Sequence, residues 1–157
     1  MADRRWWDAG VMEPKVSIIT LGCPDVAALR RFYVEGLGWT PVMEVPGEVC
    51  FIQVGGGVAL ALWRAEALAE DSGAPVGEPG SSAVALAHNV DSGDEVVDVL
   101  ARAEAAGATV LKPAGPIFFG GIQGYFADPA GFRWEVAWNP GWFVAPDGSV
   151  SLAGPPE

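Results

Sequence analysis

The stretch KVSIITLGCPDVAALRRFYVEGLG (residues 15–38) decides the fold, because its pattern returns as SAVALAHNVDSGDEVVDVLARAEAAG (residues 82–107). Each copy is an apolar strand followed by an amphipathic helix that ends at glycine. Three short apolar strands follow each helix, so residues 15–63 and 82–138 share one βαβββ order. Self-similarity of this kind predicts a pseudo-symmetric α+β fold, in which two sheets form a cup for one ligand.

The composition is that of a globular protein of one domain. The chain has 157 residues, of which 50% are hydrophobic and 18% are charged. The formal net charge is −11, from 9 Lys+Arg and 20 Asp+Glu. A surface this acidic argues against nucleic acids and anionic membranes as partners.

Cysteine use and the N-terminus predict the compartment. Cys23 and Cys50 lie far apart and match no zinc-binding spacing, so we expect two reduced thiols. The opening MADRRWWDAGVMEPK lacks the apolar segment of a signal peptide. No apolar run reaches the ~18 residues of a membrane span. We therefore expect a cytoplasmic protein.

Local signals place the elements within each copy. Asp25 is the predicted N-cap of the first helix, and Val26, Leu29 and Tyr33 form its buried stripe. An S-x-x-E capping box opens the second helix, at 92–106. The predicted strands are 15–21, 40–46, 49–54, 58–63, 82–90, 108–113, 121–127 and 132–138.

The two copies form one predicted domain, at residues 15–139, with an extension at each end. Trp6 and Trp7 in the N-terminal extension are expected to dock on the body or on a second subunit, since large aromatic side chains are costly in a free tail. The predicted segments are the extension 1–14, module one 15–63, the linker 64–81, module two 82–139 and the C-terminal tail 140–157.

Two motifs at corresponding places in the copies carry a resemblance to a known family. The segment PDVAALRRFYVEGLGW (24–39) has a helix ending in F-Y and then an L-G turn, and FADPAGFRWEV (126–136) has the form F-x-D-P-x-G-x-x-x-E. With these motifs the chain resembles the vicinal-oxygen-chelate superfamily, which includes glyoxalase I, the bleomycin-resistance proteins and the extradiol dioxygenases. The resemblance covers about 15–139 and implies a glyoxalase-like domain with a site in the concavity of its sheets.

The resemblance also implies where a metal would be held. Metal-dependent members place His or Glu on the first and last strand of each module. The matching positions here are Ile18, Ala59 or Ala61, Ala83 or Ala85, and Glu135. A divalent metal needs several N, O or S donors from the protein, and only Glu135 is one. We therefore predict no metal and no other cofactor.

Strand alternation predicts the lining of the cup. Alanine rows leave space, aromatic rings supply apolar area, and a few polar groups orient a ligand. In the strand at 49–54 the inward set is either Phe51 and Gln53, which we prefer, or Cys50, Ile52 and Val54. The candidate ligand-binding residues are Phe51, Gln53, Trp63, Asn89, Phe118, Phe119, Gln123, Tyr125, Arg133 and Glu135.

Several of these residues have a second, structural interpretation. Phe118 and Phe119 either close over a ligand or cover a sheet edge. Glu135 is either paired with Arg133, as a buried carboxylate requires a partner, or is the catalytic general base. His88 is the only histidine, and its parity places it with the core residues.

These features favour metal-free binding of a hydrophobic, aromatic small molecule, as in the sequestering and antibiotic-resistance relatives. The alternative is a lyase, isomerase or dioxygenase-like enzyme that uses Glu135 as a base or residual metal ligand. A single histidine cannot supply the two-histidine, one-carboxylate triad of non-haem iron. A purely structural dimer is disfavoured by the alanine rows, because a filled core would carry larger side chains. We expect a homodimer, and the sequence leaves open whether the modules pair within or between chains.

Overall fold

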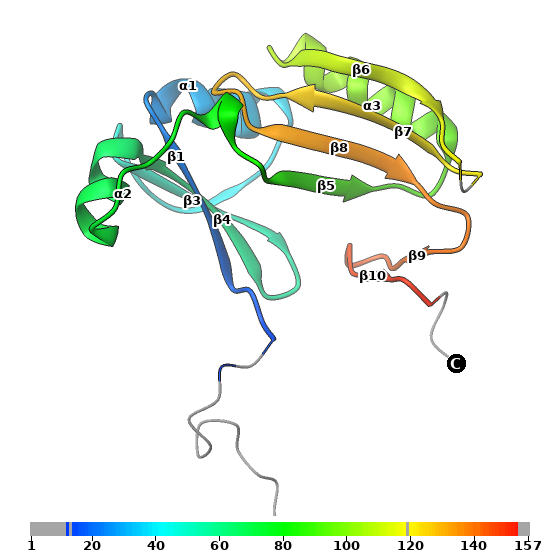
Figure 1. The fold of residues 1–157 in the computed structure, drawn as a ribbon, viewed down its shortest axis with the longest axis horizontal. Coiled ribbons are helices and arrows are strands. Elements are labelled where there is room, and N and C mark those ends of the chain that lie inside the picture. Colours follow the sequence, from blue (N-terminus) through cyan, green and yellow to red (C-terminus); the bar gives the residue numbers. More distant parts are fainter. Residues whose placement is uncertain (1–11, 13, 119, 154–157) are drawn as a thin grey trace, which may run out of the picture.

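The repeat is present in the structure, a computed structural model that describes residues 12, 14–118 and 120–153 (Figure 1). The first copy consists of β1 (Ile18–Cys23), α1 (Val26–Arg30), the π-helical turn η2 (Arg31–Gly36), β2 (Pro41–Val45), β3 (Val49–Gly55) and β4 (Val58–Arg64). The second consists of β5 (Ala85–Asn89), α3 (Gly93–Ala105), β6 (Thr109–Pro116), β7 (Ile122–Ala127) and β8 (Arg133–Trp138). The predicted α+β class is confirmed.

Both sheets have the same topology. Their strand orders are β1-β4-β3-β2 and β5-β8-β7-β6. In each sheet the first strand of the copy pairs in parallel with the last, and the other pairs are antiparallel. The sequence repeat is therefore a repeat of strand pairing as well as of element order.

The two main helices begin at their predicted caps. The side chain of Asp25 accepts a hydrogen bond from the backbone N–H of Ala28 at 2.8 Å, and that of Ser92 accepts from Glu95 at 3.2 Å. Each bond satisfies a donor that the first helical turn leaves unpaired. The first helix continues into η2, a π-helical turn that the sequence did not predict.

Alternation along the strands separates a helix-facing side from an outward side in each sheet. Ile52 and Leu60 of the first sheet, and Trp134 of the second, are buried on the helix-facing side. Phe51 and Glu135 lie on the outward sides. Phe51 and Gln53 thus lie on the side opposite Cys50 and Ile52, which are buried.

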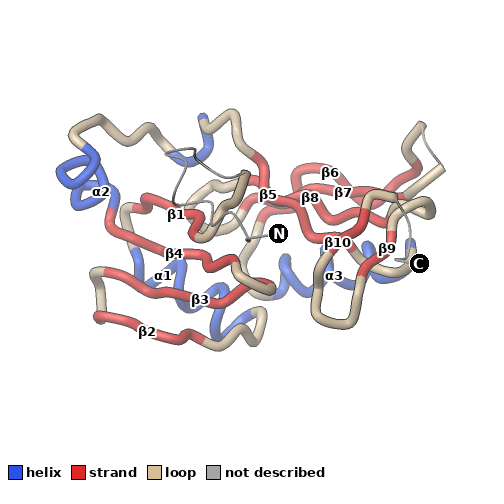
Figure 2. Tube along the Cα trace, turned by 90° about the horizontal axis from the view of Figure 1, so that it is seen from below, coloured by secondary structure: helices blue, strands red, loops and turns tan. Residues whose placement is uncertain are grey.

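The helices lie between the two sheets and join them into one core. Figure 1 shows α3 behind the second sheet, and Figure 2 shows α1 behind the first. The rings of Phe32 and Phe126 are 6.1 Å apart, as are those of Tyr33 and Trp134. A Cβ placed on Gly36 would lie 2.5 Å from the Cβ of Ala106. These contacts bury the helix-facing side of each sheet in the shared core. The outward sides, which were predicted to line the cup, point away from this core.

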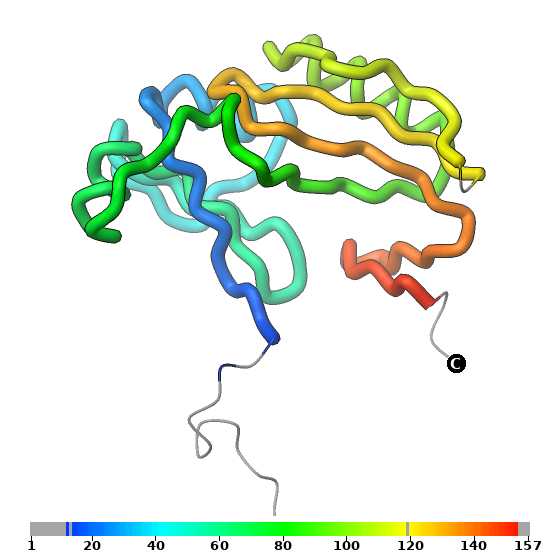
Figure 3. The backbone as a smooth tube through the Cα atoms, viewed as in Figure 1, coloured from blue at the N-terminus to red at the C-terminus, as the bar shows by residue number. Residues whose placement is uncertain are grey.

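The connecting segments are partly structured. The linker contains α2 (Ala65–Ser72) and the short 3₁₀ helix η3 (Pro79–Ser81), and Figure 3 follows it from the first sheet to β5. The tail forms a small hairpin of β9 (Phe143–Val144) and β10 (Val150–Ser151).

Some expectations differ from the structure or fall outside it. The first strand begins at Ile18 and the fifth at Ala85, later than predicted, and the sixth extends to Pro116. Trp6, Trp7 and Phe119 lie outside the described residues. In the described part of the chain, no helix is long and apolar enough to cross a membrane.

Candidate functional site

The outward side of the second sheet carries a cluster of polar side chains. Strand pairing sets Lys112, Tyr125, Glu135 and Ala87 beside one another across four strands. The amide of Gln123 bridges two of them when its nitrogen donates to Oε1 of Glu135 at 2.9 Å and its oxygen accepts from Nζ of Lys112 at 3.3 Å. The Lys112 ammonium lies 6.0 Å from the centroid of the Tyr125 ring. The cluster thus joins one acid, one base, one amide and one phenol.

The environment of the cluster affects the Tyr125 phenol. Desolvation raises the pKa of Tyr125, and the neighbouring Glu135 carboxylate raises it further. Tyr125 and Glu135 are both half-buried, so each keeps a surface for a ligand. A neutral phenol beside a carboxylate can donate a hydrogen bond, while the carboxylate accepts one or takes a proton.

Two other predicted residues on this side are held by their own neighbours. Arg133 donates to the backbone carbonyl of Gly80 at 3.2 Å, and no ion pair joins it to Glu135 within the described residues. Of the two alternatives for Glu135, pairing with Arg133 is thus not observed among the described residues, and one guanidinium nitrogen contacts the linker carbonyl instead. The side-chain oxygen of Asn89 accepts from the Asn139 amide at 3.4 Å.

The outward side of the first sheet is apolar. Phe51 lies beside Ala61, and Trp63 is half-buried on the same side. The amide of Gln53 is engaged locally, since its nitrogen lies 2.6 Å from the carbonyl oxygen of Gly55 and 2.7 Å from that of Val58. Gln53 therefore stabilises the β3–β4 turn with the amide that was predicted to orient a ligand.

The predicted residues lie on two different sheets, and the outward side of the first sheet is exposed within one chain. Ile18, Met43 and Val45 on the first outward side are 52%, 59% and 50% exposed. Phe118, at the β6–β7 loop, is 97% exposed. Lys112 is the member of the cluster that the sequence analysis missed, because bulges on both sides of it in β6 break the alternation that would have shown its side.

The residues present do not fit the metal site that the fold family implies. Strand pairing places Ile18 beside Ala59 in the first sheet, and Ala87 beside Glu135 in the second. Ala87, like the candidate positions Ala83 and Ala85, has no side-chain donor atom for a metal. Within residues 12, 14–118 and 120–153, no group of three or more His, Cys, Asp or Glu could hold a metal ion.

Residues of the two family-like motifs instead form a buried network between the modules. The hydroxyl of Tyr33 donates to Oδ2 of Asp128 at 2.6 Å and accepts from the indole N–H of Trp134 at 2.8 Å. The other carboxylate oxygen accepts three backbone N–H groups, from residues 130–132, at 3.0 Å each. Desolvation raises the pKa of Asp128, while these hydrogen bonds act in the opposite direction. The role of this network is to join the helix of one copy to the sheet of the other.

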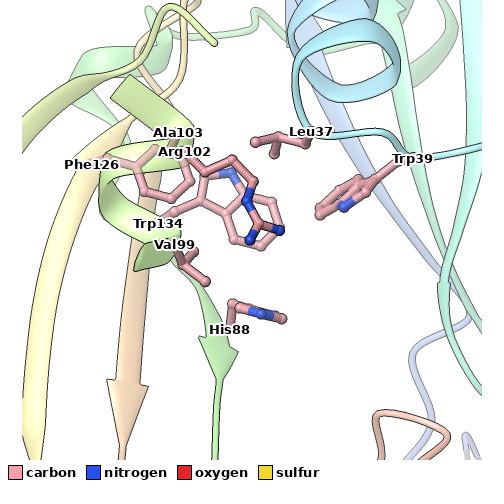
Figure 4. A pocket seen from close by; sticks show the side chains of 8 residues that line it. All are labelled: Leu37, Trp39, His88, Val99, Arg102, Ala103, Phe126 and Trp134. Carbon is pink, nitrogen blue, oxygen red and sulfur yellow. The ribbon is translucent and has the colours of Figure 1, made fainter. Parts of the chain in front are cut away.

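A cavity of about 90 Å³ lies beside this network on the helix side (Figure 4). A groove of about 780 Å³ adjoins it. Trp39, His88 and Trp134 line both spaces. His88 has the helix-facing parity that was predicted, but its side chain is exposed to this space instead of being packed in the core. Desolvation lowers the pKa of His88, and Glu95 acts to raise it.

Comparison with known proteins gives a consistent family. The family model described as Glyoxalase/Bleomycin resistance protein/Dioxygenase superfamily matches residues 15–136. A glyoxalase-related enzyme from Fulvimarina pelagi is 44% identical, with a TM-score of 0.83, over 90% of this chain and all of that one. None of the curated proteins compared matches the chain.

Two further solved structures agree with this result. A glyoxalase/bleomycin resistance protein/dioxygenase from Nocardioides is 28% identical, with a TM-score of 0.69, over 87% of this chain and 94% of that one. Lactoylglutathione lyase from Agrobacterium tumefaciens is 24% identical, with a TM-score of 0.65, over 81% and 95%. The second of these similarities concerns the fold alone.

Proposed function

Because the chain belongs to the Glyoxalase/Bleomycin resistance protein/Dioxygenase superfamily, we propose that it binds a hydrophobic, aromatic small molecule on its outward sheet sides without a metal. The observation that carries the proposal is the cluster of Lys112, Gln123, Tyr125 and Glu135, set in a row with alanine where relatives would need metal ligands. Glu135 already has a hydrogen-bonded protein partner, which suits an orienting group in an organic ligand site.

The two outward sides have complementary roles in this proposal. The first supplies flat apolar area through Phe51 and Trp63, with space above Ala59 and Ala61. The second supplies the few polar contacts. Mostly apolar walls with a small number of convergent polar groups are typical of small-molecule sites.

A second copy of the chain would bring these sides together. One chain points them away from its core, and the first side exposes Ile18, Met43 and Val45. A two-fold dimer that sets the first side of each copy against the second side of its partner forms two equal sites in one step. It would also cover these exposed apolar side chains at the two edges of the sheet.

An enzyme using Glu135 as a proton acceptor is the second candidate. The specific observation in its favour is that a carboxylate and a phenol stand together in the cluster, as general acid–base chemistry requires. The 44% identical relative from Fulvimarina pelagi is described as a glyoxalase-related enzyme. A turnover that Glu135→Gln abolishes, with binding intact, would favour this candidate over a pure binder.

The first experiment combines metal analysis with a binding assay. Protein purified without chelators or a His-tag is challenged with manganese, iron, nickel and zinc, and its metal content is measured. The neutral fluorescent aromatic N-phenyl-1-naphthylamine is then titrated with and without EDTA. We expect no stoichiometric metal and saturable probe binding that EDTA does not change. One bound metal per site, or probe binding that EDTA abolishes, would contradict the proposal.

The dimer is tested on the same samples by sedimentation equilibrium. Met43→Glu places a charge on the exposed first side and is expected to yield monomers that no longer bind the probe. Val97→Glu is the matched control, because Val97 is equally exposed on α3 and lies outside both sheets. If the wild-type chain is a monomer at all concentrations yet binds the probe, the shared site is wrong.

A further inference from the structure

The cavity between the modules has a composition unlike the rest of the chain. The chain carries 20 Asp+Glu against 9 Lys+Arg, yet neither the cavity nor the groove that adjoins it has an acidic side chain among its described lining residues. The titratable side chains that line the cavity are Arg102 of α3 and His88 of β5 (Figure 4). An acidic protein thus has a local site suited to an anion.

Arg102 is available to bind this anion. Within residues 12, 14–118 and 120–153, the ion pairs engage Arg30 and Arg64, and none engages Arg102. Figure 4 shows its guanidinium drawn across the Trp134 ring, among the side chains that line the cavity. A guanidinium in such a position can form two parallel hydrogen bonds with a carboxylate.

The aromatic walls of the cavity are held in place by contacts outside it. The Trp134 indole N–H is fixed by the Tyr33 hydroxyl at 2.8 Å. The Trp39 ring stacks on Tyr33 at 5.0 Å between centroids, and it meets the Trp134 ring edge-on at 5.8 Å and 71°. Walls that are already ordered lose little conformational entropy when a ligand binds.

The size of the space sets the size of the ligand. The inner cavity of about 90 Å³ is smaller than a dry protein cavity of ~150 Å³ that accepts benzene, but it shares Trp39, His88 and Trp134 with the adjoining groove of about 780 Å³. A single aromatic ring can therefore enter only in part, and a second fused ring has room in the groove. Leu37, Val99 and Phe126 supply further apolar lining.

From these observations we propose that the cavity between the modules is a second ligand site, which binds a small planar aromatic carboxylate. The ring lies against Trp39 and Trp134, the carboxylate accepts hydrogen bonds from the Arg102 guanidinium, and the His88 ring supplies a further N–H donor. The cavity is lined from the helix side and shares no lining residue with the outward site, although the adjoining groove also reaches Gln53 and Ala87. The carboxylate contacts, Arg102 and His88, take no part in the outward site, so the competition experiment below can distinguish failure of one proposal from failure of the other.

The test is isothermal titration calorimetry with 2-naphthoate and with its neutral analogue 2-naphthylmethanol. We expect 2-naphthoate to bind saturably and at least about tenfold more tightly than the alcohol, since a hydrogen bond to a charged group contributes about 1.5–3 kcal/mol. Arg102→Gln should weaken 2-naphthoate binding about tenfold or more and leave binding of the alcohol unchanged. Arg31→Gln is the matched control, because Arg31 is an exposed arginine of η2 outside the cavity.

A competition experiment separates this site from the outward one. Saturating N-phenyl-1-naphthylamine should not displace 2-naphthoate, and Glu135→Gln should not change its affinity. The proposal is overturned if the wild-type chain binds no 2-naphthoate, if Arg102→Gln and Arg31→Gln behave alike, or if Glu135→Gln weakens binding as much as Arg102→Gln does. Arg102 is exposed on its helix, so its replacement is not expected to unfold the chain.

Discussion

Replacing Tyr33 with phenylalanine tests the network that joins the two copies. The change removes one hydroxyl that donates to the Asp128 carboxylate at 2.6 Å and accepts from Trp134 at 2.8 Å. Loss of a hydrogen bond to a charged group costs about 1.5–3 kcal/mol, and an unsatisfied buried N–H costs about 1–3 kcal/mol. We expect the free energy of unfolding to fall by about 3–5 kcal/mol at pH 7, and Tm to fall by about 10 °C.

The same variant has a signature in pH. Asp128 is only 4% exposed, and desolvation holds its pKa above the ordinary value. A raised pKa in the folded state means that its contribution to stability is complete below the unfolded-state pKa and is lost as pH rises through the folded-state pKa. The Tyr33 hydroxyl opposes that shift, because its hydrogen bond stabilises the ionised carboxylate of Asp128. We therefore expect Tyr33→Phe to lower the free energy of unfolding most at pH 7 and less near pH 4.

Urea unfolding followed by tryptophan fluorescence at pH 7 and pH 4 measures both effects. Tyr125→Phe is the control, because Tyr125 is the other tyrosine of the chain and is half-buried on an outward side, where we expect a change below about 1 kcal/mol. A loss below about 1 kcal/mol for Tyr33→Phe at pH 7, or an equal loss at the two pH values, would refute the reasoning.

Two further predictions concern packing and thiol chemistry. Gly36→Ala should lower the free energy of unfolding by about 1–3 kcal/mol, since its Cβ would lie 2.5 Å from that of Ala106, whereas Gly55→Ala, which meets no atom within 4 Å, should leave urea unfolding nearly unchanged; equal effects would show that the modules do not pack at Gly36. The thiols of Cys23 and Cys50 should not react with Ellman's reagent at pH 8 until the chain unfolds, because both are buried and desolvation raises the pKa of Cys23 to about 11; rapid reaction of either thiol in the native protein would contradict this.

The sequence was sufficient for everything that depends on local pattern. Alternating side chains placed Phe51 and Glu135 on the outward sides, and the N-caps placed both helix starts. Each of these features is set by period, by turn residues or by a hydrogen bond within a few residues. The family resemblance was confirmed because it depends on a motif at corresponding places in the two copies.

What the sequence could not provide depends on contacts between distant segments. The partner of Arg133 is a carbonyl 53 residues away, and Lys112 lies in an irregular strand whose bulges hide its side. His88 has the parity of a core residue, but it is exposed because the modules leave a space beside it. Tyr33 lies in the first motif, and its partners Asp128 and Trp134 lie in the second, so the sequence did mark these residues. It did not indicate that the two motifs are in contact.

The shared core also shows how the two copies have diverged. Phe32 lies four residues before the glycine that ends the first helix, and its counterpart in the second copy is Ala103. Leu60 is paired with the second residue of β1, and its counterpart, paired with the second residue of β5, is Trp134. The first copy thus has a large residue on its helix and a smaller one on its sheet, and the second copy has the reverse.

This reciprocal distribution of volume makes the copies a matched pair instead of two equivalent units. Two first copies packed together would place large helix residues against each other, and two second copies would leave space between their alanine-bearing helices. Each copy therefore selects the other as its neighbour. The volumes of these four side chains therefore favour pairing of one first copy with one second copy over pairing of two identical copies.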